Sequence, residues 1–203
     1  EEGTVSIALS GSDIDSATLT YSVSSDDNVS TSIDGNILYI TGNQDFNGSL
    51  SLDVSVSDGE LSASQSLDIS ITPVNDAPVL AGVSNVSFDE DGSGSTSLSA
   101  SDVDGDDLTF SVTGGTLITA TLNGSDISFS APDNYNGSED FSVTVTDGDL
   151  ADSQSFSVTV NAVNDAPVLA SVGDRETNED EALNFLLSAS DVEGDLLTYN
   201  VSS

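Results

Sequence analysis

The sequence contains no cysteine, histidine, methionine or tryptophan. It therefore offers no disulfide, no thiol or imidazole nucleophile, and none of the nitrogen and sulfur ligands that zinc and iron sites use. Basic residues are almost as scarce, since a single Lys or Arg stands against 36 acids and the net charge is −35. Such a charge excludes a nucleic-acid backbone as a partner and disfavours anionic membranes. Oxygen-preferring cations, above all calcium (Ca2+), are the partners that remain.

Long apolar runs are missing as well. No window of about 18 apolar residues could span a membrane, and Glu1-Glu2-Gly3 has none of the features of a signal peptide. We therefore expect any export of this protein to be directed by another segment. Hydrophobic residues nevertheless make up 36% of the chain, and the mean hydropathy is −0.05. This composition is too apolar for a disordered acidic tail, so the acids are expected on the surface of a folded protein.

An internal repeat organises the chain. The stretch Val74-Asn75-Asp76-Ala77-Pro78-Val79-Leu80 recurs at residues 163–169, which is 89 positions later. The same offset relates Ser12-Asp13-Ile14-Asp15 to residues 101–104 and 190–193 without any insertion. A fixed period of this length is typical of repeat arrays. We therefore divide the chain into a first repeat over residues 1–76, a complete second repeat over 77–165 and the start of a third over 166–203.

Apolar residues alternate with Ser, Thr or Asp in each repeat, which is the pattern of half-buried strands. Pairs such as Asn123-Gly124 between these runs favour tight reversals. In the second repeat we expect strands at 79–88, 95–100, 108–113, 116–122, 126–130, 140–146 and 154–161. Short strands at this spacing predict a β-sandwich with Greek-key connections. The expected fold class is all-β, a tandem array of seven-stranded cadherin-like or immunoglobulin-like sandwiches with partial copies at both ends.

The two outer repeats are incomplete. The first lacks a strand equivalent to 79–88, and the third, with residues 166–203 alone, is too short to bury a core by itself. We expect the chain to be a slice of a longer array, or neighbouring copies to complete the partial repeats. Simple strand donation between chains fits less well, because residues 178–203 duplicate what residues 1–25 already supply.

Acidic residues gather at the two ends of each predicted sandwich. Strands of alternating direction place Asp89-Glu90-Asp91 and Asn164-Asp165 at one end, and residues 102–107 and 147–149 at the other. Ala77-Pro78 then leads directly from one repeat to the next, and the proline favours an extended link. Carboxylates that face one another across such a joint repel by about 1 kcal/mol per pair in water and about 4 kcal/mol at a partly buried site. A divalent cation with about six to eight oxygen ligands would relieve that repulsion.

The acidic residues also carry a family resemblance. Glu90, Asp102-x-Asp104, Asp147 and Asn164-Asp165-Ala166-Pro167, in this order on a seven-stranded repeat, resemble cadherin repeats. The sequence looks most like the bacterial cadherin-like tandem repeats of large secreted adhesins of the RTX type. The likeness covers the whole second repeat, nearly all of the first and the start of the third. It implies calcium bound between repeats by the linker Asn-Asp, a basal acid of the preceding repeat, and the D-x-D pair and late Asp of the following one.

Carried onto this sequence, the resemblance assigns metal ligands at two joints and at the matching positions of the first repeat. The ligands of the first joint are Glu1 or Glu2, Asn75, Asp76, Asp102, Asp104 and Asp147. Those of the second joint are Glu90 or Asp91, Asn164, Asp165, Asp191 and Glu193. The matching positions of the first repeat are Asp13, Asp15 and Asp58. Glu193 replaces the second Asp of the family pattern, and the number of ions at each joint stays open.

The expected function is that of a calcium-rigidified segment of an extracellular adhesin stalk or bacterial surface fibre. Its partners are calcium and adjacent repeats, in the same chain or in neighbouring copies. Catalysis is not expected, because the acids recur at every joint whereas catalytic sites are rarely duplicated in this way. The alternative is a calcium-dependent carbohydrate-binding β-sandwich, which needs exposed aromatic residues. Aromatics are only 5% of the chain and mostly fall at inward positions, with Tyr39 as the main exception.

Overall fold

The computed structural model describes residues 3–202, and every regular element among them is a β-strand. The all-β expectation is therefore confirmed for this part of the chain. The chain divides into two compact units. One consists of Glu1–Ala77 with Asp102–Asp107, and the other of Pro78–Ser101 with Leu108–Ser203. The acidic loop at 102–107 thus belongs to the same unit as the end of the first repeat.

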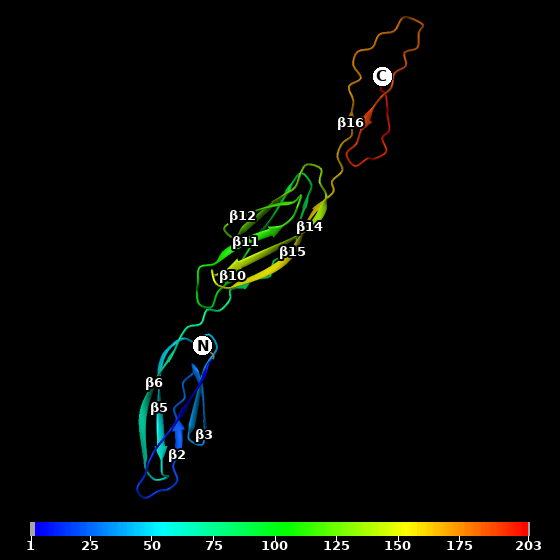
Figure 1. Ribbon diagram of the computed structural model, residues 1–203. Coiled ribbons are helices and arrows are strands. Elements are labelled where there is room, and N and C mark those ends of the chain that lie inside the picture. Colours follow the sequence, from blue (N-terminus) through cyan, green and yellow to red (C-terminus); the bar gives the residue numbers. More distant parts are fainter. Residues whose placement is uncertain (1–2, 203) are drawn as a thin grey trace. The chain divides into compact units, whose positions relative to one another are not determined.

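The first unit holds two three-stranded antiparallel sheets (Figure 1). One has the order β1-β4-β3, formed by Thr4–Ala8, Ile37–Gly42 and Val29–Asp34. The other has the order β2-β5-β6, formed by Thr20–Val23, Gly48–Ser57 and Ser62–Ile71. The buried core consists of Val29, Leu38, Ile40 and Leu52, which come from β3, β4 and β5. The alternating apolar pattern therefore directs one face of each sheet inward.

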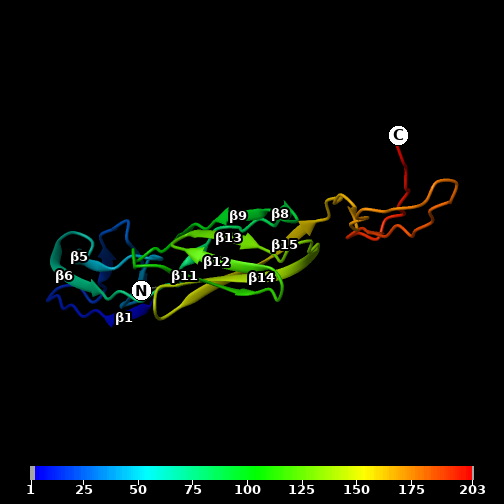
Figure 2. The same ribbon diagram turned by 90° about the horizontal axis from the view of Figure 1, so that it is seen from above.

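The second repeat builds larger sheets (Figure 2). The four-stranded sheet β11-β14-β15-β8 comprises Thr109–Gly114, Gly137–Thr146, Ala151–Asn161 and Val86–Asp89. The three-stranded sheet β12-β13-β9 comprises Thr119–Asn123, Asp126–Ser130 and Ser93–Ser97. A short pair joins β7 (Val79–Leu80) to β10 (Ala100–Ser101). All seven expected strand segments are present, but the first two are each divided.

The division of the first expected strand, 79–88, has a physical cause. Its beginning, β7, pairs antiparallel with β10, whereas its end, β8, lies parallel to β15 with Val86 opposite Val158. The Ala81 N–H still donates to Ser99 O at 2.8 Å, and beyond it the side chain of Gln154 bonds to the backbone of this segment. Its Nε2 donates to Leu80 O at 2.8 Å, and its Oε1 accepts the Val83 N–H at 3.2 Å. One run of residues thereby serves two sheets, which a period-two pattern alone does not reveal.

Aromatic rings fill the core of the second repeat. Phe129, Phe141 and Phe156 are all buried, with ring centroids between 5.3 and 6.0 Å apart. At the equivalent positions, 89 residues earlier, the first repeat carries only Ile40, Leu52 and Leu67. The two repeats therefore share a framework but not a core, and the second buries more apolar volume.

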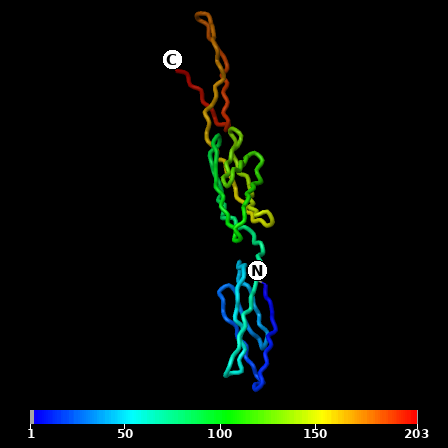
Figure 3. Tube along the Cα trace, turned by 90° about the vertical axis from the view of Figure 1, so that its left-hand side faces the viewer, coloured from blue at the N-terminus to red at the C-terminus, as the bar shows by residue number. Residues whose placement is uncertain are grey.

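Figure 3 traces the path of the residues after 165 in orange and red. The only strands among residues 166–202 are β16 (Val168–Leu169) and β17 (Ala189–Ser190), which pair with each other. Apolar side chains such as Leu186 and Leu196 are almost fully exposed. This agrees with the expectation that the start of a third repeat cannot bury a core alone.

A carboxylate replaces strand pairing at the start of β12. The expected strand 116–122 begins only at Thr119, because the backbone N–H groups of Thr116, Leu117 and Ile118 all donate to Glu139. The distances to Glu139 Oε2 are 2.7, 3.2 and 2.9 Å respectively. These bonds, that of Thr116 first, hold the pKa of Glu139 below its ordinary value of 4.5. Three converging N–H groups form an anion-binding nest that this side chain fills.

We expect Glu139→Gln to lower the free energy of unfolding by about 1 kcal/mol at neutral pH, because the amide keeps one acceptor oxygen but loses the charge. The folded pKa is lowered, so the stabilisation is present above pH 4.5 and is lost as the pH falls through the folded pKa. Urea unfolding at pH 7 and in acid should show the difference between the two proteins shrinking. The matched control is Glu60→Gln, on an exposed turn of the first unit. An unchanged difference in acid would contradict the assignment.

Candidate metal centres

The acidic loop at 102–107 gathers three carboxylates. Asp102 Oδ1 accepts the backbone N–H groups of Asp104, Gly105 and Asp106 at 2.9, 3.1 and 3.4 Å. Gly105 has a φ of 80°, which allows the chain to close this Asx-type turn. One carboxylate oxygen from each of Asp102, Asp104 and Asp106 then lies within 4.8 Å of the others. Asp106 was not among the expected ligands, although acids at every second position signal it.

The first linker, residues 72–78, is bonded to this loop. The backbone N–H of Asp76 donates to Asp104 Oδ2 at 2.8 Å, and Asn75 Nδ2 donates to the carbonyl oxygen of Asp76 at 3.2 Å. These groups all lie within the first compact unit. The structure therefore brings together four of the residues expected at the first joint, namely Asn75, Asp76, Asp102 and Asp104.

The second carboxylate oxygen of Asp102 is buried and has no hydrogen-bond partner. A charged oxygen without a partner is costly to remove from water, so this atom needs a cation or a donor. The neighbouring acids increase the cost, since each close pair of charges repels by about 4 kcal/mol at a partly buried site. All the nearby ligand atoms are oxygens, which suits a hard cation such as calcium and does not suit zinc. The residues present therefore fit the metal that the resemblance implies.

The second linker, residues 161–167, repeats the arrangement. The backbone N–H of Asp165 donates to Glu193 Oε2 at 3.2 Å, and Asn164 Nδ2 donates to Asp165 O at 2.9 Å. The second acidic loop, residues 191–196, is closed by a bond from the Asp195 N–H to Asp191 Oδ1 at 3.0 Å. Asp165 Oδ2 is again buried without a partner. The longer side chain of Glu193 thus reaches the same linker N–H that Asp104 binds in the first joint.

A basal acid also holds the second linker. Glu90 is only 6% exposed, and its Oε1 accepts the Val163 N–H at 2.5 Å. The alternative ligand, Asp91, instead accepts the backbone N–H of Asn134 at 3.0 Å and stays exposed. Glu90 is therefore the acid that lies at the linker, and Asp91 orders the neighbouring loop.

The other expected ligands lie in turns of their own. Asp147 Oδ1 accepts the N–H groups of Asp149 and Leu150, both at 2.7 Å. Asp58 Oδ1 accepts the N–H groups of Glu60 and Leu61 at 2.8 and 2.7 Å. Hydrogen bonds from the backbone, that of Leu61 first, lower the pKa of Asp58 from 3.8.

Two further groups complete the expected set. Asp13 Oδ1 accepts the N–H groups of Asp15 and Ser16, and both acids are exposed. Glu1 and Glu2 lie outside the described residues.

The aromatic residue on which the carbohydrate-binding alternative depends is not freely exposed. Tyr39 lies half-buried on β4, opposite Ser6 of β1 and Ser32 of β3. Small hydroxyl side chains on both sides leave no second aromatic ring beside it. This arrangement offers no stacked platform for a sugar ring.

Comparison with known proteins bears on the fold of the repeats. Residues 75–161 match the sequence model of the bacterial Ig domain family. Part of the fold is shared with the first three repeats of mouse protocadherin-24, at 16% identity, 92% coverage of this chain, 69% of that chain and a TM-score of 0.51. The second repeat is therefore similar to bacterial Ig domains, and its fold is similar to that of cadherin repeats. The resemblance that the sequence motifs indicated is therefore confirmed at the level of the repeat.

Two further solved structures match with lower TM-scores. The first two repeats of human protocadherin-24 match with 18% identity, 79% coverage of this chain, 88% of that chain and a TM-score of 0.49. An endo-fucoidan hydrolase of glycoside hydrolase family 107 matches with 16% identity over 85% of this chain and a TM-score of 0.36. The Ig-like chain spans only 28% of that hydrolase. No curated protein matches the sequence.

We expect Asp102→Asn to raise the stability of the metal-free protein, by about 1 kcal/mol. The asparagine oxygen can still accept the N–H groups of the turn, while the amide nitrogen replaces the buried oxygen that has no partner. Asp102→Ala removes the turn acceptor as well and should lower stability by about 1 kcal/mol. Urea unfolding in chelator measures both effects, with Asp13→Asn on the exposed loop of the first repeat as the control. Equal losses for Asn and Ala at position 102 would contradict the role of the buried oxygen.

Proposed function

We propose that this chain is a calcium-stiffened segment of an extracellular stalk, as in a bacterial adhesin or surface fibre, with metal at the linkers and no catalysis. The observation that carries the proposal is the pair of buried carboxylate oxygens without partners, Asp102 Oδ2 and Asp165 Oδ2. Each lies at a linker whose backbone N–H is bound by an acidic loop of the next repeat. Two sites with the same chemistry, one period apart, favour a property of the array over a single active site.

The proposed ligands combine the contacts at each linker with the positions that the resemblance to cadherin repeats implies. For the first joint they are Asn75, Asp76, Asp102, Asp104, Asp106 and Asp147, with Glu1 or Glu2 from the preceding end. For the second joint they are Glu90, Asn164, Asp165, Asp191, Glu193 and Asp195. Asp13, Asp15 and Asp58 would serve a joint with a repeat ahead of the first. Calcium supplies positive charge and a coordination shell of oxygens when bound.

The chain's own groups explain how metal would change stiffness. Pro78 and Pro167 favour extended geometry in the residues before them. Side-chain carboxylates accept the N–H groups of Asp76, Val163 and Asp165. Without a cation, mutual repulsion of the loop carboxylates opposes the contact with the linker. With the charge neutralised, the bonds from the Asp76 and Asp165 N–H groups fix the direction in which the chain enters the next repeat.

An extracellular location agrees with this proposal. Ligands drawn from separate loops give modest affinity, on the order of 10⁻⁴ to 10⁻³ M, which suits calcium concentrations outside cells. The strongly acidic surface keeps neighbouring molecules apart in solution.

Among residues 3–202, the structure contains no helix with the length and apolar character that crossing a membrane requires.

We expect calcium to lengthen and stiffen the protein while leaving its sheets unchanged, because the apolar cores contain no metal ligands. Small-angle scattering in calcium should give a larger maximum dimension than scattering in chelator, with the same circular dichroism in both. High sodium chloride should not replace calcium, since screening weakens repulsion without supplying coordination. Identical dimensions in calcium and chelator would refute the stalk mechanism.

We expect the two joints to respond separately to single substitutions. Asp104→Asn should weaken calcium protection of the first linker, and Asp165→Asn that of the second, by at least about tenfold, a loss typical even of outer-shell partners. Hydrogen exchange at residues 72–78 and 161–167 during a calcium titration measures each joint independently. Asp34→Asn, at the end of β3 in the first unit, is the control. Coupled loss at both linkers from either substitution would argue against independent sites.

A further inference from the structure

Three Asn-Gly pairs occur in the two sandwiches, at Asn47-Gly48, Asn123-Gly124 and Asn136-Gly137. Asparagine followed by glycine is a chemically labile pair. The backbone nitrogen of the glycine can attack the asparagine side chain, and glycine has no Cβ to hinder that approach. The three pairs differ in what surrounds them, and this difference determines which amide reacts in the folded protein.

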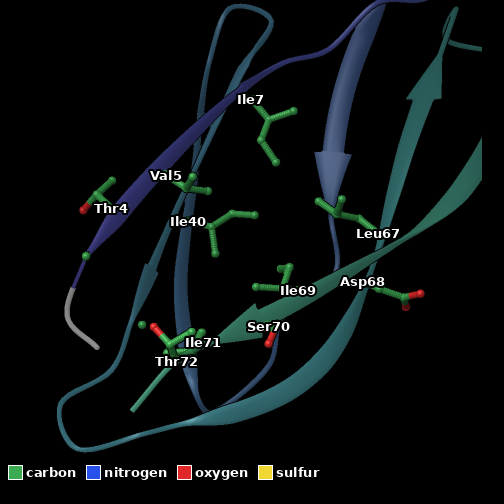
Figure 4. Close-up of a pocket in the computed structure, with 12 residues that line it drawn as sticks. Thr4, Val5, Ile7, Ile40, Leu67, Asp68, Ile69, Ser70, Ile71 and Thr72 are labelled. Carbon is green, nitrogen blue, oxygen red and sulfur yellow. The ribbon is translucent and has the colours of Figure 1, made fainter. Parts of the chain in front are cut away.

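Two of the pairs lead directly into long central strands. Gly48 is the first residue of β5 and pairs with Ile71, which Figure 4 labels at the end of β6. Gly137 is the first residue of β14 and pairs with Val160 of β15. An added Cβ on Gly137 would also lie 2.6 Å from Tyr135 Oη, so a ring covers this glycine. Both glycines must leave a ladder before their nitrogen atoms can rotate towards the preceding side chain.

The third pair lies at the turn between β12 and β13. Gly124 belongs to neither strand, makes no hydrogen bond to any described residue, and would have no atom within 4 Å of an added Cβ. Asn123 is exposed and ends β12, an edge strand that pairs with β13 over five residues. The end of a short edge strand opens locally at small cost. The Gly124 nitrogen is therefore the one with access to its asparagine.

The first repeat shows that this turn accepts an aspartate. Asp34-Gly35, which stands 89 positions earlier, forms the turn between β3 and β4, and its glycine has a φ of 60° against 63° in the second repeat. The residue across the hairpin differs between the repeats. It is Ile37 in the first and Asp126 in the second. A negative charge at position 123 would therefore stand opposite another carboxylate, which destabilises a strand pair.

We propose that Asn123 is a site of self-modification, at which the folded protein deamidates without an enzyme. The Gly124 backbone nitrogen gives up its proton to a base in the solvent and bonds to Asn123 Cγ. The bond from Cγ to the side-chain nitrogen breaks, and that nitrogen takes up a proton and leaves as ammonia. Water then adds to either carbonyl of the five-membered imide. The products are an aspartate and an isoaspartate, each with one more negative charge than the asparagine.

Both products weaken the hairpin of β12 and β13. The aspartate places like charges opposite one another at the closing pair of the hairpin. The isoaspartate lengthens the main chain by one carbon atom and so disturbs the register of β12 at its last residue. The same turn holds the chain that follows β9, because Ser125 O accepts the Leu98 N–H at 2.8 Å. An aged molecule therefore differs from a new one at this end of the second sandwich.

The test is prolonged warm incubation of the 203-residue chain at mildly alkaline pH, followed by peptide mass spectrometry that separates aspartate from isoaspartate. We expect Asn123 to react roughly tenfold faster than Asn47 or Asn136, because their glycines must first leave a ladder. In enough urea to unfold the chain, the three rates should become equal. Asn123→Gln should remove the early product, since a glutamine would have to close a larger ring. Asn136→Gln is the matched control and should retain that product.

Backbone hydrogen exchange measures the effect on the hairpin. Residues 119–130 should exchange faster in the aged protein than in the fresh protein, while residues 48–57 of the first repeat stay unchanged.

Three outcomes would overturn the proposal. Equal rates at the three pairs in the folded protein, or no reaction there at Asn123, would show that the turn gives this amide no access to its glycine. An excess at Asn123 that persists in urea would assign the preference to the local sequence and not to the fold. Unchanged exchange at residues 119–130 after complete reaction would remove the effect on the hairpin.

Discussion

At both linkers a carboxylate from the following acidic loop accepts the backbone N–H of the linker aspartate. Asp104 serves Asp76, and Glu193 serves Asp165. The linker has neither a helix nor a neighbouring strand to bind its N–H groups, so a side chain must supply the acceptor. At neutral pH an ionised carboxylate is the strongest hydrogen-bond acceptor among the side chains. Each carboxylate at the linker also brings a negative charge close to the others. The carboxylates that bind the linker N–H groups therefore also create the need for a positive counter-charge at the linker.

The residues that hold each repeat together are separate from those that hold the linkers. Strands bury aliphatic and aromatic side chains such as Leu38, Leu52 and Phe129, while the acids stay at the surface, since carboxylates are rarely buried without a partner. Glu90 is the exception, and it is buried because it binds the Val163 N–H. Under the proposed function, a change in calcium concentration would therefore act on the linkers without reaching the cores.

A constant period conceals differences between the repeats that matter for packing. Gly94 in the second repeat leaves room for Val86 and Phe88 of β8, whereas the first repeat carries Val5 at the matching position. Phenylalanines in the second core replace aliphatic residues of the first, and Glu193 replaces an aspartate without losing its backbone contact. The repeats share the pattern of strands, and the sizes of their side chains differ at equivalent positions.

The sequence by itself determined the all-β class, the period, the positions of most strands, and the acids around Asn75-Asp76 and Asp102-x-Asp104. These features are local, because alternation and turn residues act over a few positions. Tertiary structure decided that the first strand divides between two sheets, that Glu90 and not Asp91 meets the linker, and that one oxygen of Asp102 is buried without a partner. Tertiary structure also decided that β6 lies at the edge of its sheet. All of these depend on which distant segments lie side by side, and a period-two pattern specifies the face of a strand but not its neighbour.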